Sequence, residues 1–226
     1  MVADDGGQLK VTEDGSTLAC FGLDETGKEQ RLLFLDADEG EFIHELAVSQ
    51  TANMFAVNGG FTFAAVCDPE GKSGPTIQLW DVVQQMVVAE YLPYYNADIT
   101  SISMTTDARY LLSAAKDVVH VCEIFLDDDT NGRKQKLPKI SIRRQWTADT
   151  TNATTRHKIP ITKNQLKCPG SSQQLPGDIC DVGLFFTPTK SNITTVCTRP
   201  TIQHNPSLRI VVGDEGGNGH ALELVQ

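Results

Sequence analysis

The sequence predicts an all-β protein, for two reasons. Short apolar runs of strand length, such as 17–22 and 31–35, are separated by turn-forming clusters such as Asp24-Glu25-Thr26-Gly27. No window shows apolar residues at the three- and four-residue spacing of an amphipathic helix, and runs such as Phe63-Ala64-Ala65-Val66 are continuous. With 226 residues, of which 40% are hydrophobic, the chain is long enough to bury a substantial core.

The strands recur with a period that defines the architecture. The turn that opens the second strand of a unit falls at Gly15, Gly60 and Ala108, about 45 residues apart each time, which is the length of a propeller blade. One four-stranded meander cannot bury both of its faces, so neighbouring units are expected to stack around an axis as a β-propeller of antiparallel blades. Within one domain over 1–226, the predicted blade-like units are about 8–48, 49–95, 96–147 and 178–226.

The last third of the chain is less regular. We expect Lys139 to Trp146 to form the outer strand of the third unit. The segment 148–177 is polar and poor in large apolar groups, so it is predicted to be an insertion on the surface. Strand patterning then returns, and the runs predicted to build the fourth unit are Ile179 to Phe186, Ile193 to Thr198, Leu208 to Gly213 and Ala221 to Val225.

Two segments resemble WD repeats. The run 76–81 ends on Trp80 and Asp81, the pair that names the family, and follows the pattern of the third strand of a blade. The run 107–124 resembles the second and third strands, with Ser113 and Asp117 where the family places its hydrogen-bonding Ser or Thr and its tight-turn Asp. Cys122-Glu123 stands there in place of Trp-Asp. The C-terminal run 209–224, with its Gly-Asp turn before a short apolar strand, is similar to the closing blade of many such propellers.

The resemblance implies a non-catalytic scaffold that binds other proteins as a subunit of a larger assembly. Two alternatives stay open: a sensor or regulatory propeller within a larger signalling or ATPase protein, and a propeller enzyme with a site in the central channel. Four units are also fewer than the usual seven. The ring would then be incomplete in a fragment, completed by a second half-propeller through self-association, or closed with fewer blades.

Charge and hydropathy restrict the partners and the location. The net charge of −10 argues against nucleic acid and anionic membranes, and it leaves a basic protein partner as an alternative to simple solubility. No apolar run approaches the roughly 20 residues that cross a bilayer, and the acidic start, Met1 to Asp5, lacks the layout of a signal peptide. We expect a cytoplasmic protein, with cytoskeletal or ciliary sites included, and no membrane insertion.

The six cysteines indicate packing and not metal binding. Cys20, Cys67, Cys122 and Cys197 lie in apolar runs and are predicted to be buried free thiols. Cys168 and Cys180 lie in a polar stretch, and their pairing in an oxidising compartment is left open. No CxxC and no Cys/His cluster with zinc spacing occurs.

A search for catalytic, cofactor-binding and metal-binding residues predicts none. His44 and His120 lie in strands beside apolar neighbours, and no closely spaced His pair occurs. The run Asp127 to Asp129 resembles a calcium loop only superficially, because Pro138 falls where the closing acidic ligand should be. The basic stretch 134–144 is either a solvated outer strand or a docking surface for an acidic partner.

Overall fold

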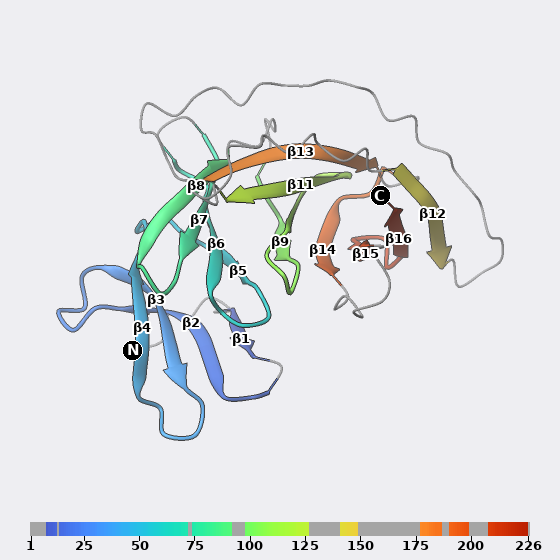
Figure 1. Ribbon diagram of the computed structural model, residues 1–226. Helices are drawn as coiled ribbons and strands as arrows, with labels where there is room; N and C mark the ends of the chain where they lie inside the picture. Colours follow the sequence, from blue (N-terminus) through green and yellow to red (C-terminus); the bar gives the residue numbers. More distant parts are fainter. Residues whose placement is uncertain are drawn as a thin grey trace.

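The computed structural model describes residues 8–12, 14–71, 74–91, 98–126, 141–148, 177–186, 190–198 and 208–225. Within these ranges every regular element is a strand, which confirms the all-β prediction. The strands form four sheets of four antiparallel strands each (Figure 1). In this described part of the chain, no helix is long and apolar enough to span a membrane.

The first two sheets are meanders of consecutive strands. The first has the order β1-β2-β3-β4 and the second the order β5-β6-β7-β8. The strands of the first sheet are β1 (Leu9–Val11), β2 (Thr17–Leu23), β3 (Gln30–Asp36) and β4 (Phe42–Ala47). Those of the second sheet are β5 (Met54–Val57), β6 (Phe63–Asp68), β7 (Thr76–Asp81) and β8 (Met86–Tyr91).

The third and fourth sheets exchange their outer strands relative to the sequence prediction. Three consecutive strands, β9 (Ser101–Met104), β10 (Tyr110–Ala115) and β11 (Val118–Leu126), begin the third sheet. The other three members of the fourth sheet are β14 (Ile193–Thr198), β15 (Leu208–Asp214) and β16 (Gly219–Val225). The outer strand of the third sheet is β13 (Gly177–Phe186), which pairs with β11. The outer strand of the fourth is β12 (Ser141–Ala148), which pairs with β16.

The predicted membership of these two segments was therefore wrong. The sequence pattern places Lys139 to Trp146 in the third unit and Ile179 to Phe186 in the fourth, whereas the observed strand order is the reverse. Both segments have strand patterning, but periodicity indicates a strand without indicating its partner. The connection between the two segments, residues 149–176, is long. The entropic penalty of closing so long a connection is nearly the same whichever sheet edge each segment joins. Of the predicted insertion 148–177, residues 149–176 lie outside the described part of the chain.

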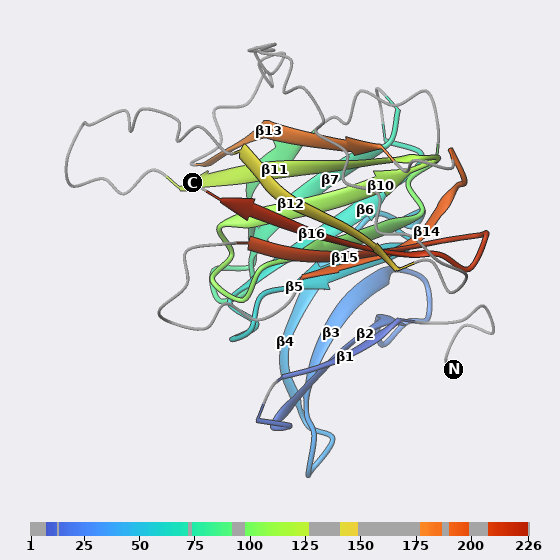
Figure 2. The same cartoon turned by 90° about the vertical axis from the view of Figure 1, so that its right-hand side faces the viewer.

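The four sheets follow one another along an arc. Figure 1 shows the first sheet, in blue, at one end and the fourth sheet, orange to red with the olive β12, at the other, and Figure 2 shows the sheets fanned at different angles. The inner strands β5, β9 and β14 contact one another in that order. On the outside, β8 contacts β13. Neighbouring sheets are thus stacked face to face, as propeller blades are.

Three apolar clusters fill the spaces between successive sheets. The first joins Leu32 and Phe34 of β3 to Phe55 and Val66 of the second sheet. The second cluster lies between the second and third sheets, and the third lies between the third and fourth sheets. Alternate residues of a central strand such as β10 point into different clusters, Leu111 into the second and Leu112 into the third. The core is therefore a row of inter-sheet layers, as expected when each blade buries its faces only against its neighbours.

The recurring turn before each second strand has one deviation from the prediction. Gly15 and Ala108 have the left-handed backbone that the period indicates, with φ of 76° and 57°. In the second unit the left-handed residue is Phe61 (φ 51°), and not Gly60. In all three turns the amide of the left-handed residue donates to the carbonyl three residues earlier. Phe61 is held in this unfavourable conformation by burial, since its ring packs edge-on against Phe34 at 6.0 Å.

The turn between β2 and β3 is organised by one carboxylate. Asp24 accepts hydrogen bonds from the backbone amides of Lys28 and Glu29 and from the Thr26 hydroxyl. The Glu29 and Lys28 amides lower the pKa of Asp24 from 3.8 to about 2. Its folded pKa is depressed, so its stabilising contribution is fully present above about pH 4 and is lost as the pH falls towards 2.

We therefore expect acid to open this turn before the core. A pH titration followed by NMR is expected to place the Asp24 carboxyl midpoint near pH 2, with the Lys28 and Glu29 amide signals shifting over the same interval. Asp24→Asn, which removes the titrating carboxylate, is the control and is expected to abolish the transition of the Lys28 and Glu29 amide signals near pH 2. Amide signals that still shift over this interval in the variant would show that the Asp24 carboxylate does not hold these amides.

Candidate functional site

The metal-ligating side chains of the described residues are dispersed through the stack. No group of three His, Cys, Asp or Glu residues among them is placed to hold a metal ion. His44 is half-buried, whereas His120 and His220 are buried inside the stack. His157, His204 and the run 127–138 lie outside the described residues. Candidate sites must therefore be sought among buried polar clusters and exposed surfaces.

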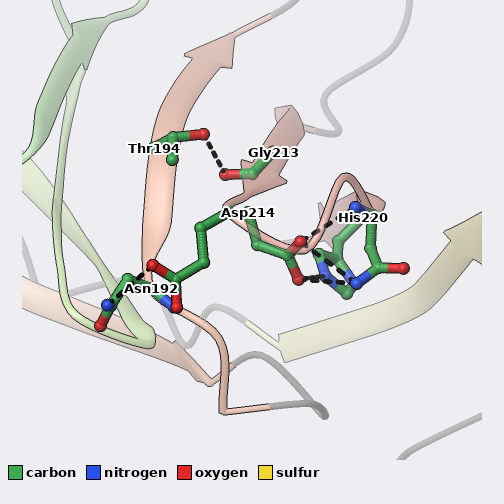
Figure 3. Close-up of polar contacts among 7 residues, drawn as sticks. Asn192, Thr194, Gly213, Asp214 and His220 are labelled. Atoms are coloured by element: carbon green, nitrogen blue, oxygen red, sulfur yellow. Dashed lines mark hydrogen bonds and ion pairs between the residues drawn. The ribbon is translucent and has the colours of Figure 1, made fainter.

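The most connected polar cluster lies in the turn between β15 and β16. The Asp214 carboxylate accepts hydrogen bonds from the Asn218 backbone amide at 2.9 Å and from the Asn218 side chain at 3.1 Å. His220 Nε2 lies 3.2 Å from Asp214 Oδ2, and both side chains are fully enclosed (Figure 3). The Asp214 side chain thus adds to the backbone hydrogen bonds that close this Gly-rich turn, Asp214 N–H to the Asn218 carbonyl and Gly217 N–H to the Asp214 carbonyl.

The same turn is bonded to the start of β14. The Glu215 carboxylate accepts from the Asn192 side-chain amide at 3.0 Å, and the Glu215 backbone amide donates to the Asn192 carbonyl. The Thr194 hydroxyl donates to the Gly213 carbonyl, as Figure 3 shows. Asp214 and His220 are buried, whereas Asn192, Thr194 and Glu215 are exposed at the edge of the sheet. These contacts join the turn to the neighbouring strand and so brace this part of the fourth sheet.

Sequence reasoning identified this Gly-rich segment only as a hairpin turn and missed the buried Asp214–His220 pair. The pairing could have been suspected from an Asp at the start of a turn and an Asn near its end, which is the pattern of a side chain that bonds its own backbone. The burial of His220 depends on the third sheet, which the local pattern does not reveal. The register places His220 opposite Val212, as His120 lies opposite Ser113 in the preceding sheet. The two buried histidines therefore hold equivalent positions in successive blades.

The WD-type residues of the second sheet lie at the end of β7. The Trp80 side chain packs against the cluster between the first and second sheets. Its Nε1 is buried and has no hydrogen-bond partner among the described residues. The Asp81 carboxylate accepts a hydrogen bond from the backbone amide of Gln84 at 2.8 Å and so shapes the turn into β8.

The third sheet carries the complementary part of the motif. Ser113 is fully buried in β10, and Asp117 lies in the turn that follows. Ser113 holds the place in the third sheet that Val66 holds in the second. Ser113 pairs with His120 between β10 and β11, and Val66 pairs with Gln78 at the same position between β6 and β7. The serine and the tryptophan of the family pattern thus stand in different blades, and the hydrogen-bonding roles expected for Ser113 and Asp117 stay predictions.

At the usual Trp-Asp position, the third sheet uses other interactions. Cys122 packs in the cluster between the second and third sheets. The carboxylate of Glu123 is almost fully buried and forms an ion pair with Arg109 Nε at 3.0 Å. The Arg109 guanidinium lies over the ring of Tyr110, 5.2 Å from its centre. In this blade Cys122 takes the place of the aromatic side chain, and the ion-paired Glu123 takes the place of the aspartate.

Two of the four cysteines predicted to be buried are not. Cys67 and Cys122 are buried, and burial raises the pKa of the Cys67 thiol to about 12. Cys20 is half-buried and Cys197 is exposed. The reason lies in the stack: Cys20 is on the outward face of the first sheet and Cys197 on the outward face of the fourth, where no described sheet covers them.

The outward face of the first sheet carries several exposed apolar side chains. Leu9 and Val11 of β1 are 58% and 52% exposed, and Phe42 of β4 is 70% exposed. The register puts these side chains on the face opposite to the one that packs on the second sheet. We call this surface the start face; its apolar residues are Leu9, Val11, Leu18, Cys20, Leu33, Leu35 and Phe42, and the exposed Glu45 lies on it opposite Leu33.

Further exposed apolar side chains lie at the turns into the outer strands β4 and β8. Ile43, Val83 and Met86 have 45%, 62% and 41% of their surface exposed, and we call them the rim residues. All three lie at the same edge of their sheets, where the third strand turns into the fourth. Large apolar side chains exposed at one edge are typical of a surface that meets another protein.

Four antiparallel four-stranded blades stacked along an arc define the class of a β-propeller, here without a closed ring. Solved structures agree. The chain is similar to the WD40 domain of SCAP from fission yeast, with 13% identity and a TM-score of 0.56, over 96% of this chain and 38% of that one. It is similar to the C-terminal WD40 domain of Sif2, with 13% identity and a TM-score of 0.53, over 97% of this chain and 46% of that one.

These likenesses confirm the WD-repeat propeller fold, and the chain spans less than half the length of either solved chain. A hydrazine synthase of Kuenenia stuttgartiensis is also similar, with 12% identity and a TM-score of 0.46, which is too low to bear on activity. No protein-family model and no curated protein sequence matches the chain.

Proposed function

We propose that the chain is a non-catalytic protein-interaction scaffold, and that it binds its partner through the rim residues within a multi-protein assembly. The observation that carries this proposal is the exposure of Ile43, Val83 and Met86 on a rigid blade stack. A surface that is already ordered loses little conformational entropy on binding. Propellers present many turns from one rigid body, which suits them to hold several proteins at once.

Local structure supports the presentation of the rim. The Asp81 carboxylate bonds the Gln84 amide, and Gln85 adopts a left-handed backbone (φ 54°), so the turn that exposes Val83 is closed by its own contacts. The adjacent residue Val82 is fully buried in the cluster between the first two sheets. The exposed side chain is therefore anchored to the core by its neighbour.

The charge around the rim indicates the chemistry of the partner. The turn before Ile43 carries four carboxylates, and the chain as a whole has a net charge of −10. These four residues are Asp36, Asp38, Glu39 and Glu41. A matching surface would combine apolar side chains with Lys or Arg at its border. Basic proteins, and not nucleic acids or anionic membranes, are the partners that this surface fits.

The test is affinity purification of the whole chain from cells under cross-linking, comparing the wild type with the double variant Val83→Asp/Met86→Asp. We expect at least one protein to be recovered with the wild type and lost with the double variant, although both have the same circular dichroism and thermal midpoint. Lys28→Ala, at an exposed turn on the opposite edge of the first sheet, is the matched control and should recover the same protein.

A second arm locates the contact. Replacing residues 149–176 with a Gly-Ser linker tests the predicted polar insertion as an alternative binding segment. Recovery that survives the linker and fails with the rim variant supports the rim. Recovery that fails only with the linker would overturn the rim as the binding surface, and a protein that purifies alone under all conditions would overturn the scaffold.

A further inference from the structure

β4 is the outer strand of the first sheet, and one of its two edges is open. β4 pairs with β3, the sheet order ends at β4, and no described strand bonds to its other side. Figures 1 and 2 both place β4 at the margin of the first sheet. Four of its six residues are exposed, whereas β8, the outer strand of the second sheet, exposes only Met86 and contacts β13. The edge of β4 is therefore accessible to an added strand.

The hydrogen-bond pattern shows which backbone groups line this edge. Every second residue of β3 bonds to β4, counted from Asp36, whose amide donates to the Glu41 carbonyl. The residues in between bond to β2, and the next one along, Ala37, does donate to the Ser16 carbonyl. The β4 partners of those in-between residues therefore direct their N–H and C=O groups away from β3. These partners are Phe42, Glu45 and Ala47.

A bulge limits the length of the edge. Ile43 is the extra residue between Phe42 and His44 in the pairing with β3. A bulge bends the strand and twists the edge, which is one way in which proteins prevent edge-to-edge aggregation. Beyond the bulge, residues 44–47 pair regularly with β3. The edge thus fits a short strand, and not the long flat pairing that leads to aggregation.

The first sheet is strongly acidic. Residues 8–48 contain ten Asp or Glu and three Lys or Arg, so they contribute −7 to the net charge of −10. Glu45 lies on the edge itself, with its exposed side chain on the start face, and Glu39 and Glu41 are exposed in the adjoining turn. An added strand with Lys or Arg opposite Glu45 gains from this charge, since opposite charges on paired strands attract.

The same charge disfavours a second copy of this chain as the added strand. Pairing β4 with β4 of another copy would bring together two acidic edges, each with its Glu45, and like charges on paired strands repel. A basic segment meets no such penalty. When a strand is added to a sheet, main-chain hydrogen bonds supply the affinity, and here the charge supplies the selectivity.

We propose that an extended basic segment of a partner protein adds to the edge of β4 as a fifth strand of the first sheet. This inference rests on the proposed scaffold function and deepens it, because it names the kind of segment with which the partner binds beside the rim residue Ile43. Val83 and Met86, the other two rim residues, belong to the second blade. Variants can therefore separate strand addition from the rim contact.

Peptides test strand addition directly. The probe is a fluorescent peptide of about eight residues that alternates Lys with Val, which favours strands, and its binding to the 226-residue chain is measured by fluorescence polarisation. We expect saturable binding, and no binding of the matching peptide that alternates Glu with Val. Equal binding of both peptides, or none of either up to about 1 mM, would overturn the proposal.

Two methylated versions of the Lys/Val peptide isolate the backbone contribution. One carries N-methyl groups on every Lys and the other on every Val, so both keep the charge. In an added strand the amides of alternate residues face β4, so one version loses these donors and the other loses only solvent-facing amides. We expect their affinities to differ by about tenfold or more. Equal affinities would show that charge alone holds the peptide and would overturn strand addition.

Two variants of the edge locate the contact. Glu45→Lys is expected to weaken binding of the Lys/Val peptide by about three- to tenfold, because an attraction becomes a repulsion. Glu70→Lys makes the same change of charge in an exposed turn of the second sheet and is the matched control. Ala47→Pro removes an edge amide that is not directed at β3, so it should weaken binding to a similar degree and leave the circular dichroism unchanged. An affinity for Glu45→Lys equal to that of Glu70→Lys would overturn β4 as the binding edge.

Hydrogen exchange identifies the edge residue by residue. With saturating Lys/Val peptide the amides of Glu45 and Ala47 should exchange more slowly, whereas the Leu46 amide, which is directed at β3, should not change. Glu45 and Ala47 amides that are protected without peptide, and increasingly so as the chain is concentrated, would show that a second copy occupies the edge. That result would overturn the basic segment as its occupant.

The partner-recovery experiment separates this inference from the scaffold itself. Ala47→Pro is expected to lose the same protein that Val83→Asp/Met86→Asp loses. If that protein is still recovered with Ala47→Pro, strand addition is overturned and the scaffold stands. If the wild type recovers no protein while the Lys/Val peptide binds, the scaffold fails and the open edge keeps its affinity for a basic strand.

Discussion

Replacing Phe34 by Ala is expected to lower the free energy of unfolding by about 3–5 kcal/mol. The side chain is 1% exposed and belongs to the cluster between the first and second sheets, with the Phe61 ring edge-on at 6.0 Å. The substitution removes apolar contacts and leaves a cavity that the two sheets can only partly collapse. Globular domains have a total stability of about 5–15 kcal/mol, so a large share of it is lost.

Urea denaturation followed by tryptophan fluorescence measures this effect. Trp80 packs against the same cluster and reports on the contact between the two sheets. Val83→Ala, at a side chain that is 62% exposed, is the control and should change stability by no more than about 0.5 kcal/mol. Equal midpoints for the two variants would show that the first sheet does not depend on this cluster.

Replacing Asp214 by Ala is expected to destabilise the chain by about 2–3 kcal/mol. The carboxylate is buried and is bonded to the Asn218 amide and to His220 Nε2, so its removal leaves buried donors without this acceptor. The turn between β15 and β16 loses the side chain that shapes it. Because Glu215 of the same turn is bonded to Asn192, the start of β14 should loosen as well.

Two measurements check this prediction: hydrogen exchange of the Asn218 backbone amide and the midpoint of thermal unfolding. Faster exchange at Asn218 with a lower midpoint is the expected pair of results. Asp214→Asn should be milder, since its side-chain oxygen still accepts one bond. Glu39→Ala, in an exposed turn, is the control with little expected change. Stability equal to this control would mean that the Asp214–His220 pair adds nothing to the fold.

Local patterns predicted those features that depend on neighbouring residues. The strand-length runs and turn clusters indicated the meanders of the first two sheets, because consecutive strands joined by short turns pair with each other. The turn period indicated Gly15 and Ala108 correctly. It was displaced by one residue in the second unit, where packing of Phe61 on Phe34 holds the left-handed position. From backbone sterics alone, the neighbouring Gly60 is the residue expected in the left-handed conformation.

Features that depend on distant segments were not predicted. The segments at β12 and β13 both have strand patterning, and only the tertiary structure shows that each pairs with the sheet predicted for the other. The same applies to Cys20 and Cys197, which resemble Cys67 and Cys122 in local sequence but lie on the outward faces of the stack. Apolar neighbours in the chain do not show whether another sheet covers them.

The all-β class, the blade period and the turn chemistry can be read from the amino-acid sequence, because each follows from residues within one or two strands of each other. The structure was needed to find which outer strand completes which sheet, which histidines are enclosed and which apolar faces no described sheet covers. Burial and long-range pairing are properties of the whole stack: a strand specifies its two faces, and the sheets around it determine what those faces contact.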